Sequence, residues 1–226
     1  MRINFHENGR IYVIYGPMFS GKTLELLNTF DFIRHSSHPW QIFKPDSEYR
    51  PELHGQDFPS SWLVSRGFND KPIGMPATTV PENSVTNMFS NLNPEVVRNK
   101  GYIGIDEAIH FKGDLIGLVK ELTHYGVSVV ISGLNMDFRG EPFAPVPELM
   151  ALSSYHKEKV GVCMSNLGNG KTCDNDGTHS MRVYNGEPAP YDAPITEIGT
   201  NQYKVVCGQH HIVPGRPTKF NLEELL

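Results

Sequence analysis

The sequence of 226 residues lacks several features that mark specialised classes of protein. No apolar run approaches the roughly 20 residues that a membrane-spanning helix needs, which argues against a membrane protein. The net charge of −5 at pH 7 offers no basic surface of the kind that nucleic-acid binding requires. The first residues also lack the apolar stretch of a secretory signal, so we expect a cytoplasmic protein with no membrane or nucleic-acid partner.

Cysteine is also scarce, with only Cys163, Cys173 and Cys207 in the chain. An odd number of cysteines in a reducing compartment argues against a disulfide framework and favours metal binding or packing. Hydrophobic residues make up 38% of the sequence, and its length suffices for one large domain or a domain and a half. We therefore expect a globular protein with a core of ordinary size.

The first two thirds of the chain alternate between two kinds of pattern. Short apolar runs rich in β-branched and aromatic residues predict buried strands at 12–15, 40–43, 102–105 and 127–131. Apolar residues at steps of three and four predict amphipathic helices over 26–33 and 115–122. This alternation indicates an α/β fold with an open parallel sheet, which binds ligands at the carboxyl ends of its strands.

From about Ser153 the composition changes, because Gly, Pro, Asn and Asp become frequent. We predict an α/β nucleotide-binding domain at 1–152, a small loop-rich domain at 153–213 and a C-terminal tail at 214–226. The stretch 184–200 shows no periodicity and predicts a long excursion of the chain. Loops of that length in compact proteins are usually functional or disordered.

A phosphate-binding loop is predicted directly after the first strand. The pattern G-x4-G-K-[ST] lets successive backbone N–H groups wrap the phosphates of a nucleotide, because glycines allow the chain to bend. Lys22 then contacts the β- and γ-phosphates, and Thr23 ligates Mg²⁺. A simple Gly-rich turn is the alternative interpretation. The predicted nucleotide-binding residues are Gly16, Pro17, Met18, Phe19, Ser20, Gly21, Lys22 and Thr23.

A similar pattern at 168–172 has no apolar strand before it, and we interpret that segment as a polar loop.

Two acidic residues follow the third predicted strand. Asp106 is placed to hold Mg²⁺ together with Thr23 beside the bound nucleotide. Glu107 is the natural general base, able to take a proton from a substrate hydroxyl that attacks the γ-phosphorus. A solvated Asp-Glu pair that caps the next helix is the alternative, but a phosphate loop needs an acidic partner at such a place.

The cysteines and a histidine form a candidate zinc site. Tetrahedral zinc accepts three thiolates and one imidazole, and Cys207-x2-His210 supplies two ligands from one turn. Nine residues stand between Cys163 and Cys173, which is wider than the usual two to four. Because protein fills all four positions, the zinc would be structural. Buried unpaired cysteines are the alternative, and His211 can replace His210 as the fourth ligand.

Three motifs together resemble the type II thymidine kinase family, the cytosolic zinc-containing kind. They are the phosphate loop, Ile-Asp-Glu-Ala at 105–108, and Gly-Leu-Asn-Met-Asp-Phe-Arg-Gly-Glu-Pro-Phe at 133–143. The resemblance extends from about Gly9 to His211. It implies a P-loop NTPase-like open parallel sheet with a small zinc-stabilised lasso domain. It also implies ATP with Mg²⁺ and thymidine as substrates, a homotetramer, and feedback inhibition by dTTP.

The resemblance assigns roles to further residues. Glu107 matches the proton acceptor of the family. The family's K-P-x-x-D-x-R element is similar to the segment with Lys44-Pro45, Glu48 and Arg50, which suggests Arg50 as a phosphate-side residue. Phenylalanines of the 133–143 motif enclose the base in this family. The other substrate-binding residues implied are Met18, His110, Phe138, Phe143, Ser180, Arg182 and Tyr203.

The chain departs from the family pattern at three places. His110 stands where the family has a base-stacking phenylalanine, and Arg66 stands where a histidine is common. The first zinc knuckle resembles C-x2-C with about seven extra residues at 165–171.

These observations predict ATP-dependent phosphorylation of the 5′-hydroxyl of thymidine, giving dTMP. Discrimination against deoxyuridine rests on one methyl group, worth only about 1 to 3 kcal/mol. A kinase for deoxyuridine or a 5-substituted deoxypyrimidine is therefore an alternative. A catalytically silent nucleotide-binding regulatory protein is another, and the intact set Lys22, Thr23, Asp106 and Glu107 weighs against it.

Overall fold

A computed structural model describes residues 9–47, 57–67, 69, 71–195, 202–218 and 220. These residues divide into two compact units. The first unit draws on Met1–Gly16, Ser20–Asn135 and Phe143–Lys159. The second draws on Pro17–Phe19, Met136–Pro142 and Val160–Leu226. The tip of the phosphate loop and part of the 133–143 motif thus group with the C-terminal unit.

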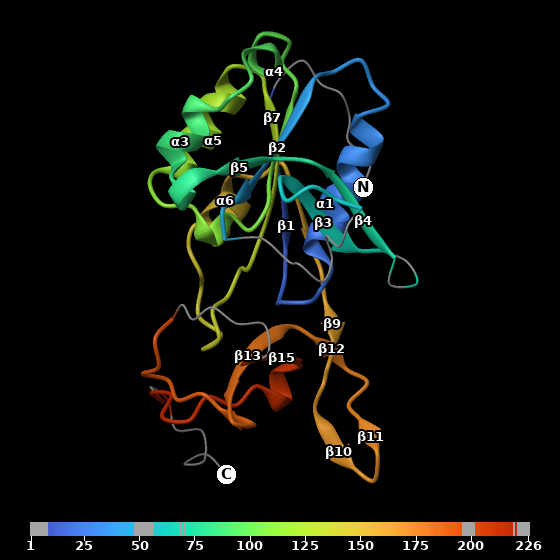
Figure 1. The fold of residues 1–226 in the computed structure, drawn as a ribbon. Coiled ribbons are helices and arrows are strands. Elements are labelled where there is room, and N and C mark those ends of the chain that lie inside the picture. The colour runs from blue at the N-terminus through green and yellow to red at the C-terminus, as the bar shows by residue number, and fades with distance from the viewer. Residues whose placement is uncertain are drawn as a thin grey trace. The chain divides into compact units, whose positions relative to one another are not determined.

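The first unit is built around a parallel sheet (Figure 1). Among the described residues its six strands lie in the order β5-β2-β6-β7-β1-β8, and each pairing is parallel. The strands are β1 (Ile11–Tyr15), β2 (Trp40–Pro45), β5 (Thr78–Val80), β6 (Tyr102–Ile105), β7 (Ser128–Gly133) and β8 (Tyr155–Glu158). All four residues of β6 and all six of β7 are buried, as expected for strands covered on both faces.

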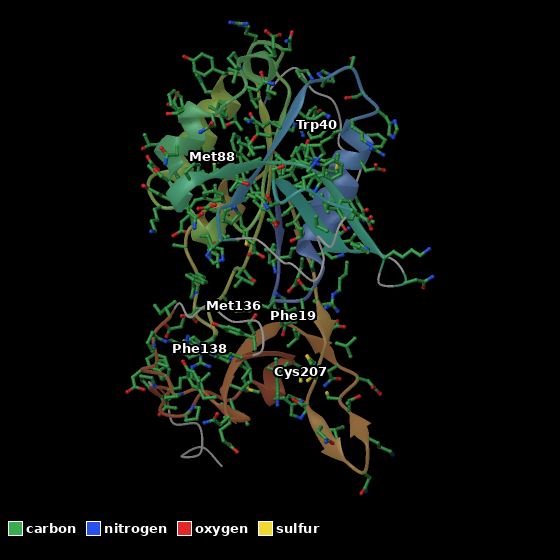
Figure 2. All side chains as sticks on the ribbon, in the orientation of Figure 1. Phe19, Trp40, Met88, Met136, Phe138 and Cys207 are labelled. Carbon is green, nitrogen blue, oxygen red and sulfur yellow. The ribbon has the colours of Figure 1, made fainter. Side chains whose placement is uncertain are left out.

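Both faces of the sheet are covered. Alternate side chains of a strand point to opposite faces, so the inner strands β1, β2, β6 and β7 each contribute to two core clusters. Tyr12 and Ile14 of β1 share a core cluster with α1 (Lys22–Ile33) and with the antiparallel hairpin β3–β4 (Trp62–Arg66 and Pro72–Pro76). Met88 and Trp40 lie on opposite sides of the sheet in Figure 2. The helices of the other face are α3 (Val85–Ser90), α4 (Pro94–Arg98), α5 (Leu115–His124) and α6 (Val146–Leu152).

The predicted α/β class with an open parallel sheet is confirmed. The four predicted strands correspond to β1, β2, β6 and β7, and the two predicted helices to α1 and α5. The edge strands β5 and β8 and the hairpin β3–β4 carry no clear periodicity and were not predicted. Short 3₁₀ turns, η2 (Pro81–Asn83) and η3 (Ala108–His110), complete the unit.

The second unit consists of short antiparallel pairings around a small core. The strands are β9 (Gly161–Val162), β10 (Asn166–Gly168), β11 (Lys171–Thr172), β12 (Asp176–Gly177), β13 (His179–Tyr184), β14 (Glu187–Pro188) and β15 (Tyr203–Val206), followed by η5 (Gly208–His210). β13 lies between β14 and β15, β9 pairs with β12, and β10 pairs with β11. The core includes all three cysteines with Met181, Val183 and Val206.

The segment 168–172, predicted to be a polar loop, belongs to the exposed hairpin β10–β11. Asn169 and Gly170 form its turn with positive φ angles, and open space surrounds Gly170. The next element of the described chain is the strand β12 and not a helix, so the segment lacks the setting of a phosphate loop.

None of the helices in the described part of the chain combines the length and apolar character that crossing a membrane requires.

Candidate active site and metal centre

The predicted phosphate loop connects β1 to α1, and its backbone requires glycine at both ends. Gly16 has a φ of 145°, and a Cβ at this position would lie only 2.0 Å from the carbonyl oxygen of Lys159. Gly21 has a φ of 80° and precedes the first residue of α1. Lys22 and Thr23 begin that helix and are buried. The loop thus presents the positive end of a 12-residue helix beside a buried lysine, an arrangement suited to phosphate.

Asp106 follows β6 and is completely buried. The Thr23 hydroxyl lies 3.1 Å from one of its carboxylate oxygens, and the Ser132 hydroxyl donates to the other. A buried carboxylate needs such donors, because an unpaired charge inside a protein is costly. The structure therefore brings together Thr23 and Asp106, the two residues that the sequence predicts for Mg²⁺.

Ser132 is a residue of this site that the sequence did not reveal. It lies in β7, which is the neighbour of β6 in the sheet, with Ile105 aligned to Ile131. The next position in this register places Ser132 beside Asp106. Only the strand order makes this visible, since 26 residues separate the two positions in the sequence.

Glu107 adopts a left-handed backbone conformation, with φ 49° and ψ 56°. This region is sparsely populated by residues other than glycine, asparagine and aspartate, and such strain gathers at functional sites. Glu107 precedes η3, yet its side chain makes no capping hydrogen bond there. The alternative that the acidic pair caps the next helix therefore finds no support at Glu107.

Several residues that the family resemblance assigns to the substrate lie close together in the second unit. The backbone amide of Met18 donates to the Ser180 hydroxyl at 2.8 Å. The guanidinium of Arg182 lies 4.0 Å from the centre of the Phe138 ring and 5.8 Å from that of Tyr203. Cation–π contact of this kind fixes the mutual placement of the three side chains.

Arg182 is almost completely buried and has structural partners. Its guanidinium donates to the carbonyl oxygens of Pro194 and Ile195, which belong to the predicted excursion 184–200. Residues 196–200 lie outside the described residues. In this structure Arg182 therefore anchors the excursion to β13.

The remaining predicted substrate residues are elsewhere in the chain. His110 ends η3, and Phe143 follows the 136–142 segment; both are half-buried and group with the first unit. Arg50 lies outside the described residues.

The three cysteines and His210 form a compact cluster of metal donors. Their ligand atoms all lie within 4.8 Å of one another, and His210 Nδ1 is 3.5 Å from Cys163 Sγ and 3.3 Å from Cys207 Sγ. A tetrahedral zinc ion with Zn–S bonds of about 2.3 Å places its sulfur ligands about 3.8 Å apart. The donor set and its spacing therefore fit zinc, and Figure 2 shows sulfur atoms gathered near Cys207.

The cysteines and the histidine of this cluster shift one another's pKa values. Burial raises the pKa of Cys163, but hydrogen bonds from the Cys207 and Ser165 backbone and from the Ser165 and His210 side chains outweigh it and lower that pKa to about 6. Hydrogen bonds to the thiolates of Cys163 and Cys207 raise the pKa of His210. The lowered pKa values of Cys163 and Cys207 favour thiolate, the form that binds zinc, at these two positions. Despite a hydrogen bond from the Asn175 backbone, burial and the two neighbouring cysteines raise the pKa of Cys173.

The hairpin β10–β11 explains the wide spacing of the first two cysteines. Its antiparallel pairing returns the chain, and the Cys173 amide donates to the Ser165 carbonyl at 2.9 Å. Cys163 and Cys173 therefore lie close together, as the two cysteines of a C-x2-C knuckle do. The extra residues between them form the hairpin.

His211 has other partners than the cluster. Its Nε2 lies 2.8 Å from the Phe138 carbonyl oxygen, and its ring stacks on His179 with 4.5 Å between centres. Of the two candidate histidines, the structure thus places His210 in the donor cluster.

A parallel sheet with the predicted phosphate loop between β1 and α1, and an acidic pair at the end of β6, defines the P-loop class of α/β fold. The family model for thymidine kinase matches residues 9–211, which include the loop, the acidic pair and the donor cluster. The protein belongs to the thymidine kinase family, which confirms the resemblance seen in the sequence and supports kinase activity.

Proposed function

We propose that this protein transfers the γ-phosphoryl group of ATP to the 5′-hydroxyl of thymidine, giving dTMP and ADP. The observation that carries the proposal is the hydrogen-bonded pair Thr23 and Asp106 beside Lys22, with Glu107 as the next residue. These are the parts that phosphoryl transfer needs: a phosphate cradle, a site for Mg²⁺ and a base. The family match supports thymidine as the acceptor.

Each residue has a defined task in the proposed reaction. The loop amides and Lys22 bind the phosphates and stabilise the charge of the transferring group. Thr23 and Asp106 would hold Mg²⁺, and the bound ion would neutralise phosphate charge. Glu107 accepts the proton of the 5′-hydroxyl as the hydroxyl oxygen forms a bond to the γ-phosphorus. The bond from that phosphorus to the bridging oxygen breaks, and ADP leaves.

The family resemblance supplies the candidate nucleoside-binding residues. We propose that the nucleoside is bound by Met18, Arg50, His110, Phe138, Phe143, Ser180, Arg182 and Tyr203. Phe138 and Tyr203 provide aromatic surface close to Arg182. His110, in place of phenylalanine, makes the base pocket more polar, so deoxyuridine and 5-substituted deoxypyrimidines belong among the substrates to be tested.

A panel of deoxynucleosides tests the proposal. With ATP and Mg²⁺, ADP release should depend on the added nucleoside and be fastest with thymidine. Faster turnover of deoxyuridine would shift the assignment to another deoxypyrimidine. ATP binding without nucleoside-dependent ADP release would instead identify a regulatory protein. The family resemblance further leads us to propose a homotetramer and inhibition by dTTP, which mass measurement in solution and addition of dTTP to the same assay will test.

A further inference from the structure

Two lysines share one carboxylate next to the phosphate loop. Lys157 Nζ lies 2.7 Å from one oxygen of Glu25, and Lys159 Nζ lies 3.4 Å from the other. Glu25 belongs to the first turn of α1, and its side chain is only 14% exposed. Two ammonium groups face a single carboxylate, so the cluster carries an excess of positive charge where a nucleotide would carry negative charge.

Lys159 is the lysine that contacts the loop. Its amide donates to the Tyr15 carbonyl at 2.7 Å, and its own carbonyl packs directly against Gly16. Its Cε lies 4.0 Å from the position that a Cβ on Gly21 would take. The side chain therefore passes the glycine that precedes α1, and it remains 27% exposed.

The two ion pairs differ in strength. Lys157 makes the shorter contact, whereas the contact of Lys159 is long and partly solvated, and such pairs contribute little stability. The pKa of Glu25 is lowered, because the hydrogen bonds and charges of both lysines outweigh the effect of burial. If Lys159 left, Lys157 would still neutralise Glu25, so no buried charge would remain without a partner.

We propose, building on the proposed function, that Lys159 is a second phosphate-binding cation for the donor nucleotide. When phosphates occupy the loop, the Lys159 ammonium moves from Glu25 to the phosphate chain, and Lys157 retains the carboxylate. The flexible four-carbon stem of lysine permits this change of partner, and the multiple charges of a nucleotide attract the ammonium more strongly than a carboxylate already paired.

The variants Lys159→Met and Glu25→Gln separate this role from a purely structural ion pair. Both remove the ion pair between Lys159 and Glu25. We expect Lys159→Met to weaken ATP binding about tenfold, the size of one charge-assisted hydrogen bond. Glu25→Gln should keep or increase ATP affinity, because it frees Lys159. Isothermal titration with ATP and Mg²⁺, without nucleoside, measures this, and thermal unfolding measures the shared structural effect.

Equal losses of ATP affinity in both variants, or an unchanged affinity in Lys159→Met, would overturn the assignment. The test is independent of the acceptor. A wild-type protein whose ATP binding depends on Lys159, but which shows no thymidine-dependent ADP release, would refute the proposed kinase activity and support the role of Lys159. A wild-type protein that does not bind ATP would refute both.

Discussion

The backbone conformation of Glu107 is the feature of this single residue that points to a functional role. A left-handed conformation in a glutamate costs of the order of 1–3 kcal/mol and persists only where the surrounding structure imposes it. Here it follows Asp106, whose side chain is fixed by two hydroxyl groups. The rigid neighbour and the strained backbone together set the direction in which the Glu107 carboxylate leaves the chain.

Glu107→Gln should reduce kcat by about 10²- to 10⁴-fold, the contribution typical of a general base. The amide keeps the size of the side chain but cannot accept the proton. Binding of ATP and of thymidine should remain near the wild-type level, which titration of each ligand will show. A variant with a near wild-type rate in a steady-state assay would refute the role of Glu107.

Ser132→Ala should raise the Mg²⁺ concentration that gives half-maximal activity by about tenfold, because residues that orient a metal ligand typically affect affinity by 10- to 100-fold. The matched control is Ser128→Ala. Ser128 is also a buried serine of β7, but its hydroxyl accepts a hydrogen bond from the Arg10 amide instead. Direct Mg²⁺ titration of the ATP complex should show the same difference. Equal Mg²⁺ dependence in the two variants would contradict the prediction.

The elements of the sheet could be predicted from the sequence where burial leaves a pattern. β1, β2, β6 and β7 are continuous apolar runs because both faces are covered. The edge strand β8 carries exposed and polar residues, Tyr155 to Glu158, so no such run marks it. Lys157 of β8 and Lys159, which follows the strand, contact Glu25 across more than 130 positions, and only the pairing of β8 with β1 makes this contact visible.

Some residues of the candidate site could also be predicted from the sequence, and others could not. Lys22, Thr23, Asp106 and Glu107 were predicted because their chemistry is tied to short motifs, and their roles remain predictions. Ser132 and Lys159 were not predicted, because only the pairing of β7 and β8 with neighbouring strands places them at the site. The zinc ligands were predicted, but the hairpin that closes the nine-residue gap required the structure.

The hairpin β10–β11 should be dispensable for metal binding. Deletion of residues 165–171 leaves Met164 and Thr172 between Cys163 and Cys173, which is the usual C-x2-C spacing. We expect one zinc per chain in the shortened protein, measured by metal analysis after gel filtration. Cys173→Ser provides the control that should lose zinc. Loss of zinc in the deletion variant would show that the hairpin itself builds the site.

At the scale of the whole molecule, the two units have different sources of stability. The first has extensive clusters on both faces of its sheet, whereas the core around the cysteines is small. Small domains commonly need a metal to fold, and zinc contributes about 10 kcal/mol or more of apparent binding free energy in zinc-finger peptides. We therefore expect zinc to govern the folding of the second unit selectively.

Removal of zinc by a chelator should expose the second unit to trypsin. Arg182 and Lys204 lie in the paired strands β13 and β15, where the folded backbone resists cleavage. After chelation we expect rapid cleavage at both, while a fragment that contains residues 20–135 survives. Mass spectrometry identifies the products, and re-addition of zinc should restore protection. An unchanged digestion pattern after complete zinc removal would show that the unit folds without metal.

Both tryptophans of the chain, Trp40 and Trp62, lie in strands of the first unit. Emission excited selectively from indole therefore originates in that unit alone, whereas the tyrosines are divided between the two units. The unlabelled protein thus carries a native optical reporter of its first half, and a denaturation experiment that compares this emission with a signal to which both units contribute can determine whether the halves melt together or apart.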